Sequence, residues 1–361
     1  MIDVRPVLIM AGGTGGHVFP ALAVADELRA RGVPVVWLGT KAGIESRLVP
    51  QAGYPIEWMS ITGLRGKNTL TLLLAPVRIV MACWQALRVL LRRRPCAVLG
   101  MGGFASGPGG LMAWLIRKPL LVHEQNAIAG MTNKILSRFA SVVLQAFPGV
   151  FKNAKTTGNP VRQSICELTA PSERFARRDV KNKLRLLVIG GSLGAVKLNE
   201  IIPQSLATIA VADRPEVIHQ TGVKNIDAAR DLYRSTDVDA KVEAFIDDMP
   251  AAYEWADLVI CRSGAMTVFE LAAAGVASVL VPYPYAVDDH QTGNARYLES
   301  AGAAIVRQQD ELTTDWLVAV INDFSANRNK LLEMAVAARK LAIPGSAKTI
   351  ADECQTAGGI A

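Results

Sequence analysis

A glycine-rich turn that follows a short apolar run occurs twice in this chain, and it constrains the fold more than any other feature. The first copy spans Gly12–His17 after Val7–Met10, and the second spans Gly190–Ala195 after Leu186–Ile189. A strand that leads through such a turn into a helix presents bare N–H groups at the helix start, which favours anions. One copy alone is weak evidence, because a tight connection without a ligand has the same pattern. Two copies, half a chain apart, predict two similar α/β units.

Size and charge agree with two domains that act on an anionic partner. A chain of 361 residues is too long for one ordinary core. The net charge of +7 indicates phosphate, nucleic acid or acidic lipid, with ordinary solubilising charge as the alternative. The five cysteines are scattered and show no CxxC spacing, so we expect reduced thiols and no zinc site. No stretch is apolar enough to predict a transmembrane helix.

Strand and helix signals alternate along both halves, which predicts parallel sheets covered by helices on both faces. Such sheets bind ligands beyond the carboxyl ends of their strands. Two segments in the first half lie at such positions. The glycine-dense segment 100–110 would allow a close approach of the backbone to a ligand, and Leu120–Val122 would deliver the polar cluster His123–Asn126. Gly158–Arg162 reads as a hinge between the two domains.

The segment 70–94 is apolar and carries arginines at regular spacing. On a helix, one stripe would be polar and the apolar side chains would cover the opposite side. One interpretation is a packed helix with a solvated basic stripe. The other is a membrane surface in which Leu73, Trp84 and Leu87 enter the lipid and the arginines contact anionic headgroups. The polar stripe consists of Arg78, Gln85, Arg88 and Arg92.

Seven motifs together identify a family, although each alone is weak. They are GGTGGHVFPALAVA (12–25), GMGGFASGPGG (100–110), HEQNAIAGMTNK (123–134), GNPVR (158–162), FIDDM (245–249), RSGAMTVFE (262–270) and DDHQTGNA (288–295). In this order they resemble the MurG family of bacterial glycosyltransferases, in glycosyltransferase family 28, over essentially the whole chain. One departure is Leu193, where the family usually has glutamine in a GGSQGA loop.

The resemblance implies the GT-B fold, in which two Rossmann-like α/β domains with parallel sheets face a deep cleft. It implies transfer of N-acetylglucosamine from UDP-GlcNAc to the 4-hydroxyl of MurNAc in undecaprenyl-pyrophosphoryl-MurNAc-pentapeptide, which converts lipid I to lipid II. Acceptor and membrane are expected on residues 1–161 and the donor on 162–341, with a last helix of about 342–361 packing back on the first domain. The expected location is peripheral, on the cytoplasmic face of the inner membrane, with other cell-wall synthesis proteins as partners. Neither nucleic acid, cofactor nor metal is implied.

The donor contacts implied by the resemblance fall mainly in the second half. Ile246 resembles the backbone contact to uracil, and Glu270 resembles the carboxylate that holds both ribose hydroxyls, for which a bidentate acceptor is suited. Ser192 and the helix start at 265–267 resemble the diphosphate site. The full set of implied donor contacts is Thr14, Gly15, Gly16, Asn126, Arg162, Ser192, Ile246, Ala265, Met266, Thr267, Glu270, His290 and Gln291.

The acceptor side is implied at Gly13, His17, Gly103 and Phe104, and the turn at 12–17 is expected to face the lipid pyrophosphate. An α-linked donor and a β-linked product imply one inverting, in-line displacement, which needs a base for the acceptor hydroxyl. We predict His17 as this base, because the unperturbed pKa of histidine suits the role. Glu124 is the alternative base, and a purely structural or binding role for His17 stays open. Arg162 and helix N-terminal N–H groups would stabilise the departing UDP.

Other functions remain to be separated from this one. A UDP-GlcNAc 2-epimerase or another UDP-sugar GT-B enzyme shares the layout, but an epimerase has no use for the segment 70–94. A nicotinamide dehydrogenase would need GxGxxG and an acidic residue where the second strand ends in Gly39-Thr40. A non-catalytic membrane-binding module would not need two phosphate loops. A metal-dependent transferase would need an Asp-x-Asp ligand pair, and Asp237-Val238-Asp239 lies in a polar loop without supporting ligands.

Overall fold

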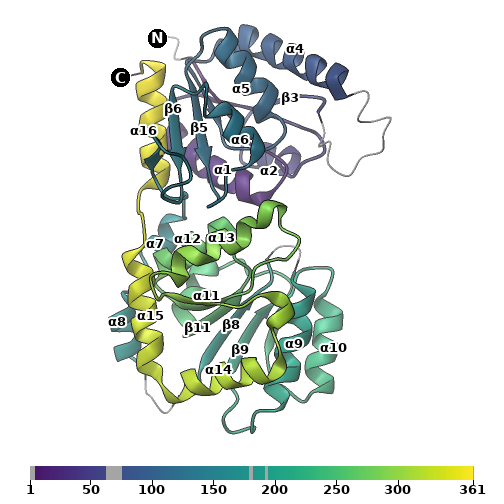
Figure 1. Cartoon of the computed structure of the whole chain (residues 1–361), viewed down its shortest axis with the longest axis vertical. Helices are drawn as coiled ribbons and strands as arrows, with labels where there is room; N and C mark the ends of the chain where they lie inside the picture. Colours follow the sequence, from purple (N-terminus) through teal and green to yellow (C-terminus); the bar gives the residue numbers. More distant parts are fainter. Residues whose placement is uncertain (1–4, 62–74, 179–181, 192–193, 361) are drawn as a thin grey trace. The chain divides into compact units, whose positions relative to one another are not determined.

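The chain forms two compact units, each built on a parallel β-sheet (Figure 1). The computed structural model describes residues 5–61, 75–178, 182–191 and 194–360. Unit 1 comprises Met1–Val161 together with Gly345–Ala361, and unit 2 comprises Arg162–Pro344. The predicted fold class, two Rossmann-like parallel α/β sheets, is confirmed.

The sheet of unit 1 has seven strands in the order β3-β2-β1-β4-β5-β6-β7. The central strand β1 pairs in parallel with β2 and with β4, so that Val7 lies opposite both Val35 and Ala97. The order of the strands along the chain reverses at β1, which is the position where sheets of this kind bind ligands. The strands are β1 Val7–Met10, β2 Val35–Gly39, β3 Ile56–Trp58, β4 Ala97–Gly100, β5 Leu120–Glu124, β6 Val142–Gln145 and β7 Lys155–Thr156.

Helices cover both faces of this sheet, because successive residues of each strand point to opposite faces. Ile9 packs under α1 and α16, in one core with Ile350. Met10 packs on the other face, in a core with Leu90 of α4. The helices of unit 1 are α1 Gly15–Ala30, α2 Glu45–Gln51, α4 Ala75–Arg93, α5 Ser106–Leu115, α6 Met131–Leu136 and α16 Ser346–Gly358.

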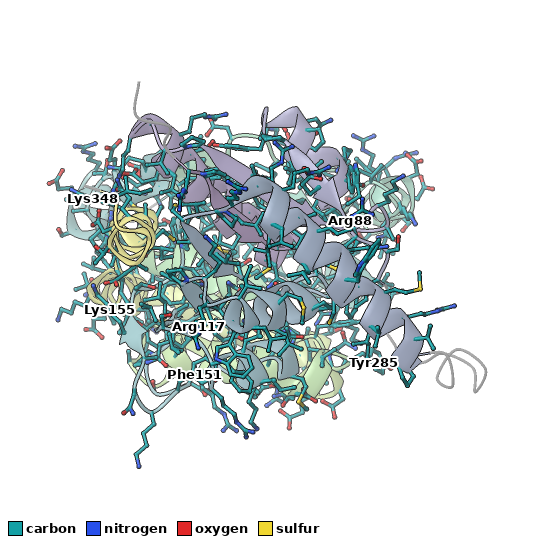
Figure 2. All side chains as sticks on the ribbon, turned by 90° about the horizontal axis from the view of Figure 1, so that it is seen from above. Arg88, Arg117, Phe151, Lys155, Tyr285 and Lys348 are labelled. Atoms are coloured by element: carbon teal, nitrogen blue, oxygen red, sulfur yellow. The ribbon has the colours of Figure 1, made fainter. Side chains whose placement is uncertain are left out.

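Helix α16 comes from the far end of the sequence and lies on unit 1, beside β6 in Figure 1. Arg31 forms an ion pair with Asp352 at 2.5 Å, and Lys155 forms one with Glu353 at 2.7 Å. Figure 2 shows Lys155 close to this helix. These pairs are partly exposed and add little free energy, so burial of Ile350 and its neighbours is the main contribution to docking.

The glycine-rich segments of unit 1 extend into helices. Helix α1 begins at Gly15, inside the glycine turn. Helix α5 begins at Ser106, so the second half of the glycine-dense segment 100–110 is helical. Its glycines allow the helix to pack closely on the sheet, since a Cβ at Gly109 would lie 2.3 Å from Met10 Sδ. The segment after Arg162 forms the helices α7 Gln163–Cys166 and α8 Pro171–Ala176.

The sheet of unit 2 has six strands in the order β10-β9-β8-β11-β12-β13, and its order reverses at β8. One core of this unit joins Leu186 and Val188 of β8 to α9 and α14. The strands are β8 Arg185–Ile189, β9 Glu216–Gln220, β10 Lys241–Glu243, β11 Leu258–Cys261, β12 Ala277–Leu280 and β13 Ala304–Val306. The longer helices are α9 Val196–Ala207, α10 Ile226–Ser235, α11 Met249–Trp255, α12 Ala265–Ala274, α13 His290–Glu299, α14 Thr314–Ala326 and α15 Arg328–Lys340.

Among the described helices, none combines the length and the apolar character that a membrane span requires.

A buried histidine in unit 2 makes stability depend on pH. His219 is fully buried and its Nδ1 lies 2.9 Å from the Tyr233 hydroxyl. Burial lowers the pKa of His219 to about 3. Between that value and the ordinary pKa near 6.5, the unfolded chain binds a proton that the folded chain does not, so the free energy of unfolding falls as the pH falls.

We therefore expect a His219→Gln variant to lose less stability in acid than the natural chain. From pH 6.5 to 4.5 the histidine lowers the free energy of unfolding by about 2 kcal/mol, and glutamine, which does not titrate, removes this loss. Urea unfolding of both chains at each pH measures the two free energies of unfolding. The contribution of the carboxylates is the same in both chains and therefore drops out of the difference. Parallel loss of stability in the two chains would contradict the assignment.

Candidate functional site

The first glycine turn already holds an anion, and this anion belongs to the protein. Glu45, at the start of α2, is fully buried and accepts hydrogen bonds from Gly13 N at 2.9 Å and Thr40 N at 3.0 Å. Gly12 leaves room for it, since a Cβ there would lie 2.5 Å from Glu45 Oε1. The Gly13 N–H is therefore bonded within the protein, and the predicted contact of this turn with the lipid pyrophosphate would use its other N–H groups. Gly15 and Gly16, in the first turn of α1, retain the N–H groups that lack an intrahelical acceptor.

The glycines after β4 bring two loops of unit 1 together. Gly103 has φ 89°, and a Cβ there would lie 2.5 Å from the carbonyl oxygen of Gly12. Gly102 has φ 101°, and a Cβ there would lie 2.7 Å from Cε1 of His17. We expected these glycines to permit close approach of a ligand, but they permit close approach of the first glycine turn. Phe104, the next residue, is exposed.

His17 is half-buried in the first turn of α1 and contacts the polar cluster at the end of β5. Its Nδ1 lies 2.8 Å from Gln125 Oε1. Gln125 is fully buried, and its Nε2 lies 3.0 Å from Nδ1 of His123. His123 lies within β5, which is longer than expected, and burial lowers its pKa to about 4. The turn after β1 and the strand β5 therefore meet at His17.

Glu124 is buried and organises its own loop. Its Oε1 accepts hydrogen bonds from the backbone N and the side-chain Nδ2 of Asn126, at 3.0 and 3.3 Å. Its Oε2 accepts from Gly130 N at 3.1 Å and from Asn133 Nδ2 at 2.9 Å. A carboxylate with four donors has its lone pairs directed into the fold, which disfavours Glu124 as a base. Asn126 is half-buried beside it, and Thr14 is exposed at the cap of α1.

In unit 2, Glu270 lies on α12 with a side chain that is 17% exposed. Its Oε2 accepts a hydrogen bond from the Tyr253 hydroxyl at 3.1 Å, and its Oε1 lies 3.7 Å from the guanidinium of Arg162. Burial raises the pKa of Glu270, and Arg162 and Tyr253 oppose this rise. The carboxylate is thus pre-oriented, with one oxygen facing an exposed arginine. Arg162, expected as a brace for departing UDP, is near this carboxylate.

The starts of α12 and α13 are tied together. Ser263 Oγ donates to Gln291 O at 2.9 Å, and Gln291 Oε1 accepts from Tyr283 N at 2.9 Å. Ala265, Met266 and Thr267 form the first turn of α12, where N–H groups are unpaired within the helix. His290 Nδ1 lies 2.7 Å from Val287 O.

The backbone before α13 is strained. Asp288 and Asp289 have φ values of 54° and 50°, which few residues other than glycine adopt. Such conformations persist where the surrounding structure enforces them, frequently at binding sites. Here the strained pair sets the direction from which His290 and Gln291 enter the helix.

The second glycine turn follows β8, at the reversal of strand order in unit 2. Gly194 has φ 77°, and a Cβ there would lie 2.1 Å from Thr221 O, so this turn also packs against its neighbour loop. Ser192 and Leu193 lie outside the described residues. Ile246 is buried three residues after β10, beside the exposed Phe245.

Helix α4 exposes apolar and basic side chains on the same face, which corrects the expectation of opposite faces. The core-facing residues are Ala75, Ala82, Ala86, Val89 and Leu90. The outward stripe, which we call the α4 face, consists of Val77, Val80, Met81, Trp84, Arg88 and Leu91. The guanidinium of Arg88 lies 4.6 Å from the ring of Trp84. Leu87 is half-buried, and Leu73 lies outside the described residues.

Four residues of these sites carried no assigned role in the sequence: Glu45, Gln125, Tyr253 and Asn133. Gln125 belongs to the polar cluster His123–Asn126 that the sequence analysis singled out. Nothing in the sequence indicated that its partner is His17. Gly39 and Gly43 precede Glu45 in the sequence, and a Cβ at either glycine would collide with the Glu45 side chain. A glutamate surrounded by glycines is a signal of a buried carboxylate only once the fold is known.

Comparison with known proteins first defines the class. The Glycosyltransferase family 28 N-terminal domain matches residues 7–145, and the family 28 C-terminal domain matches residues 185–350. The calicheamicin glycosyltransferase CalG4 has the same fold, with a TM-score of 0.71 at 16% identity over 98% of both chains. The chain is thus a GT-B glycosyltransferase of family 28.

Full-length relatives narrow this class. The chain is 52% identical over 350 residues to a UDP-N-acetylglucosamine–N-acetylmuramyl-(pentapeptide) pyrophosphoryl-undecaprenol N-acetylglucosamine transferase of Dechloromonas aromatica, covering 97% of this chain and 98% of that one. It is 54% identical to the transferase of the same name from Nitrosococcus oceani, over 96% and 97%. The crystal structure of Acinetobacter baumannii MurG matches with a TM-score of 0.86 at 42% identity, over 98% and 99%. The chain therefore belongs to the MurG family.

Proposed function

We propose that the chain transfers N-acetylglucosamine from UDP-GlcNAc to the 4-hydroxyl of MurNAc in undecaprenyl-pyrophosphoryl-MurNAc-pentapeptide. The observation that carries the proposal is the identity of more than half of all positions to transferases of that name, over nearly the whole chain. Both candidate sites, one in each unit, support it, because each lies where the strand order reverses.

Unit 2 is the proposed donor site. Glu270 accepts the two ribose hydroxyls, and Tyr253 holds its second oxygen in place. The N–H groups at the start of α12 face the diphosphate, which suits their partial positive charge. Ile246 contacts uracil through its backbone, and His290 and Gln291 contact the sugar or its phosphates. Ser192 is also proposed to contact the diphosphate.

Unit 1 is the proposed acceptor site, with Gly103, Phe104 and the turn at 12–17 as its wall. In the proposed step, His17 takes the proton of the acceptor hydroxyl. At the same time the hydroxyl oxygen forms a bond to C1 of N-acetylglucosamine. The bond between C1 and the phosphate oxygen breaks, and UDP leaves with the electron pair. Helix N-terminal N–H groups and Arg162 stabilise the charge on UDP.

Release of UDP from UDP-GlcNAc, with and without a lipid I analogue, tests the function. We expect release that depends on the analogue, together with a disaccharide product. Release without acceptor would indicate an epimerase-like activity, and no release in either condition would favour a binding module. Either result would overturn the proposal.

The α4 face is the proposed site of peripheral docking on the cytoplasmic face of the inner membrane. Val80 is 68% exposed and Trp84 58% exposed, beside Arg88 and the exposed arginines that end the helix. Apolar side chains that enter the lipid and cations at headgroup level are the pattern of interfacial helices. Figure 2 shows Arg88 on α4 and Arg117 just beyond α5 in this part of unit 1.

Replacing Val80, Met81 and Trp84 with serine is expected to weaken binding to anionic liposomes roughly tenfold or more, because their buried apolar area is lost. Turnover of a soluble acceptor should stay unchanged, since the α4 face lies outside both sites. Liposome flotation measures the binding. Val211→Ser with Val223→Ser, two exposed valines of unit 2, is the matched control. Undiminished binding of the triple variant would remove the α4 face as the docking surface.

A further inference from the structure

A string of hydrogen bonds runs from His17 into the interior of unit 1. His17 Nδ1 lies 2.8 Å from Gln125 Oε1, and Gln125 Nε2 lies 3.0 Å from His123 Nδ1. His123 Nε2 lies 3.1 Å from the carbonyl oxygen of Gly158. The backbone of Gln125 is itself held, because Asn159 Nδ2 donates to its carbonyl at 3.0 Å. His123 and Gln125 are fully buried, so water does not compete for these bonds.

The carbonyl at the inner end determines where every proton of the string lies. A carbonyl oxygen only accepts, so Nε2 of His123 carries the proton and donates to Gly158. His123 stays neutral, since burial lowers its pKa to about 4. Its Nδ1 is therefore a bare acceptor, and Gln125 must present its amide nitrogen to it.

A second carbonyl confirms the orientation of this amide. Gln125 Nε2 also donates to the carbonyl oxygen of His123, at 3.0 Å. The other end of the amide, Oε1, consequently faces His17 and can only accept. His17 must then donate from Nδ1, and its Nε2 is left with the lone pair.

We propose that Gln125 is a positioning residue that holds His17 in the Nδ1–H tautomer, with the lone pair of Nε2 directed to the acceptor hydroxyl. This inference rests on the proposed function, in which His17 is the base. When Nε2 takes the hydroxyl proton, the Nδ1–H bond to Gln125 persists and stabilises the imidazolium. His123 acts one step further away, by fixing which end of the amide faces His17.

The ring of His17 is confined as well as oriented. It lies against Gly102, where any side chain would enter its space. Rotation of the ring would break the bond to Gln125 and leave a fully buried amide oxygen without a partner, which costs about 1 to 3 kcal/mol. The same neighbours therefore fix both the tautomer and the ring plane.

Nitrogen NMR of the chain labelled at its histidines tests the tautomer directly, without any variant of Gln125. We expect the signal that disappears in His17→Gln to show a protonated Nδ1 and an unprotonated Nε2. The opposite tautomer in the natural chain would overturn the inference, even if the chain transfers N-acetylglucosamine as proposed.

Gln125→Leu, which keeps the volume and removes both polar ends, tests the consequence for turnover. We expect the Nε2–H tautomer of His17 to appear and kcat to fall 10- to 100-fold, with the donor KM unchanged. Thr157→Val is the matched control: Thr157 Oγ1 also lies near His123 Nε2, at 3.2 Å, but Gly158 still accepts its proton. A changed tautomer with unchanged kcat would overturn the positioning role. Absence of transfer by the natural chain would refute the proposed function instead.

Discussion

Replacing Glu270 with alanine is expected to raise the KM for UDP-GlcNAc on the order of 100-fold. Two hydrogen bonds from ribose hydroxyls to a carboxylate, each worth about 1.5 kcal/mol, would be lost together. Turnover at saturating donor should change much less, because the ribose is remote from the bond that breaks. Steady-state kinetics with varied donor, and direct titration with UDP, measure the two effects.

Two matched variants locate the effect at this carboxylate. Tyr253→Phe removes only the hydroxyl that orients Glu270, so its increase in KM should be smaller. Glu299→Ala removes an exposed carboxylate on α13 and should leave KM unchanged. If Glu270→Ala binds UDP as tightly as the natural chain, the ribose site lies elsewhere.

Replacing His17 with glutamine is expected to lower kcat by about 10²- to 10⁴-fold, the usual contribution of a general base. Glutamine keeps a polar group near Gln125 but has no basic nitrogen. The affinity for UDP-GlcNAc should be nearly unchanged, since the proposed donor contacts that hold uridine belong to unit 2. Single-turnover rates with a lipid I analogue, alongside UDP titration, separate these quantities.

Glu124→Gln is the comparison that tests the alternative base. Glu124 accepts four hydrogen bonds within its own loop, so we expect this change to lower thermal stability as well as turnover. His17→Gln should lower turnover alone. Natural turnover in His17→Gln would show that the base is another residue.

The glycine turns illustrate how far local sequence reaches. Their position between an apolar strand and a helix is a local property, and in the structure both turns follow the strand at which the strand order reverses. What occupies the first turn is not local. Glu45 approaches Gly13 because β1 and β2 are adjacent in the sheet, and no pattern within residues 12–17 contains that information.

The α4 face shows the same division. Helical periodicity predicts which side chains of α4 lie on one stripe, but not which stripe packs on the sheet. The small residues Ala82 and Ala86 face the core because the helix lies close to α5, and this leaves Trp84 outside with Arg88. The exposure of Trp84 agrees with the interpretation in which this residue enters the lipid, whereas Leu87 is half-buried.

The sequence by itself determined the two α/β units, their parallel sheets, the family and the segments that carry the candidate sites, because these follow from hydrophobic period, turn residues and motif order. Only the tertiary structure decided which groups in those segments contact one another. Gln125 contacts His17, which is 108 residues away in the sequence, and Tyr253 contacts Glu270, which is 17 residues away. Such contacts depend on which strands and helices are neighbours, and that is a property of the whole fold.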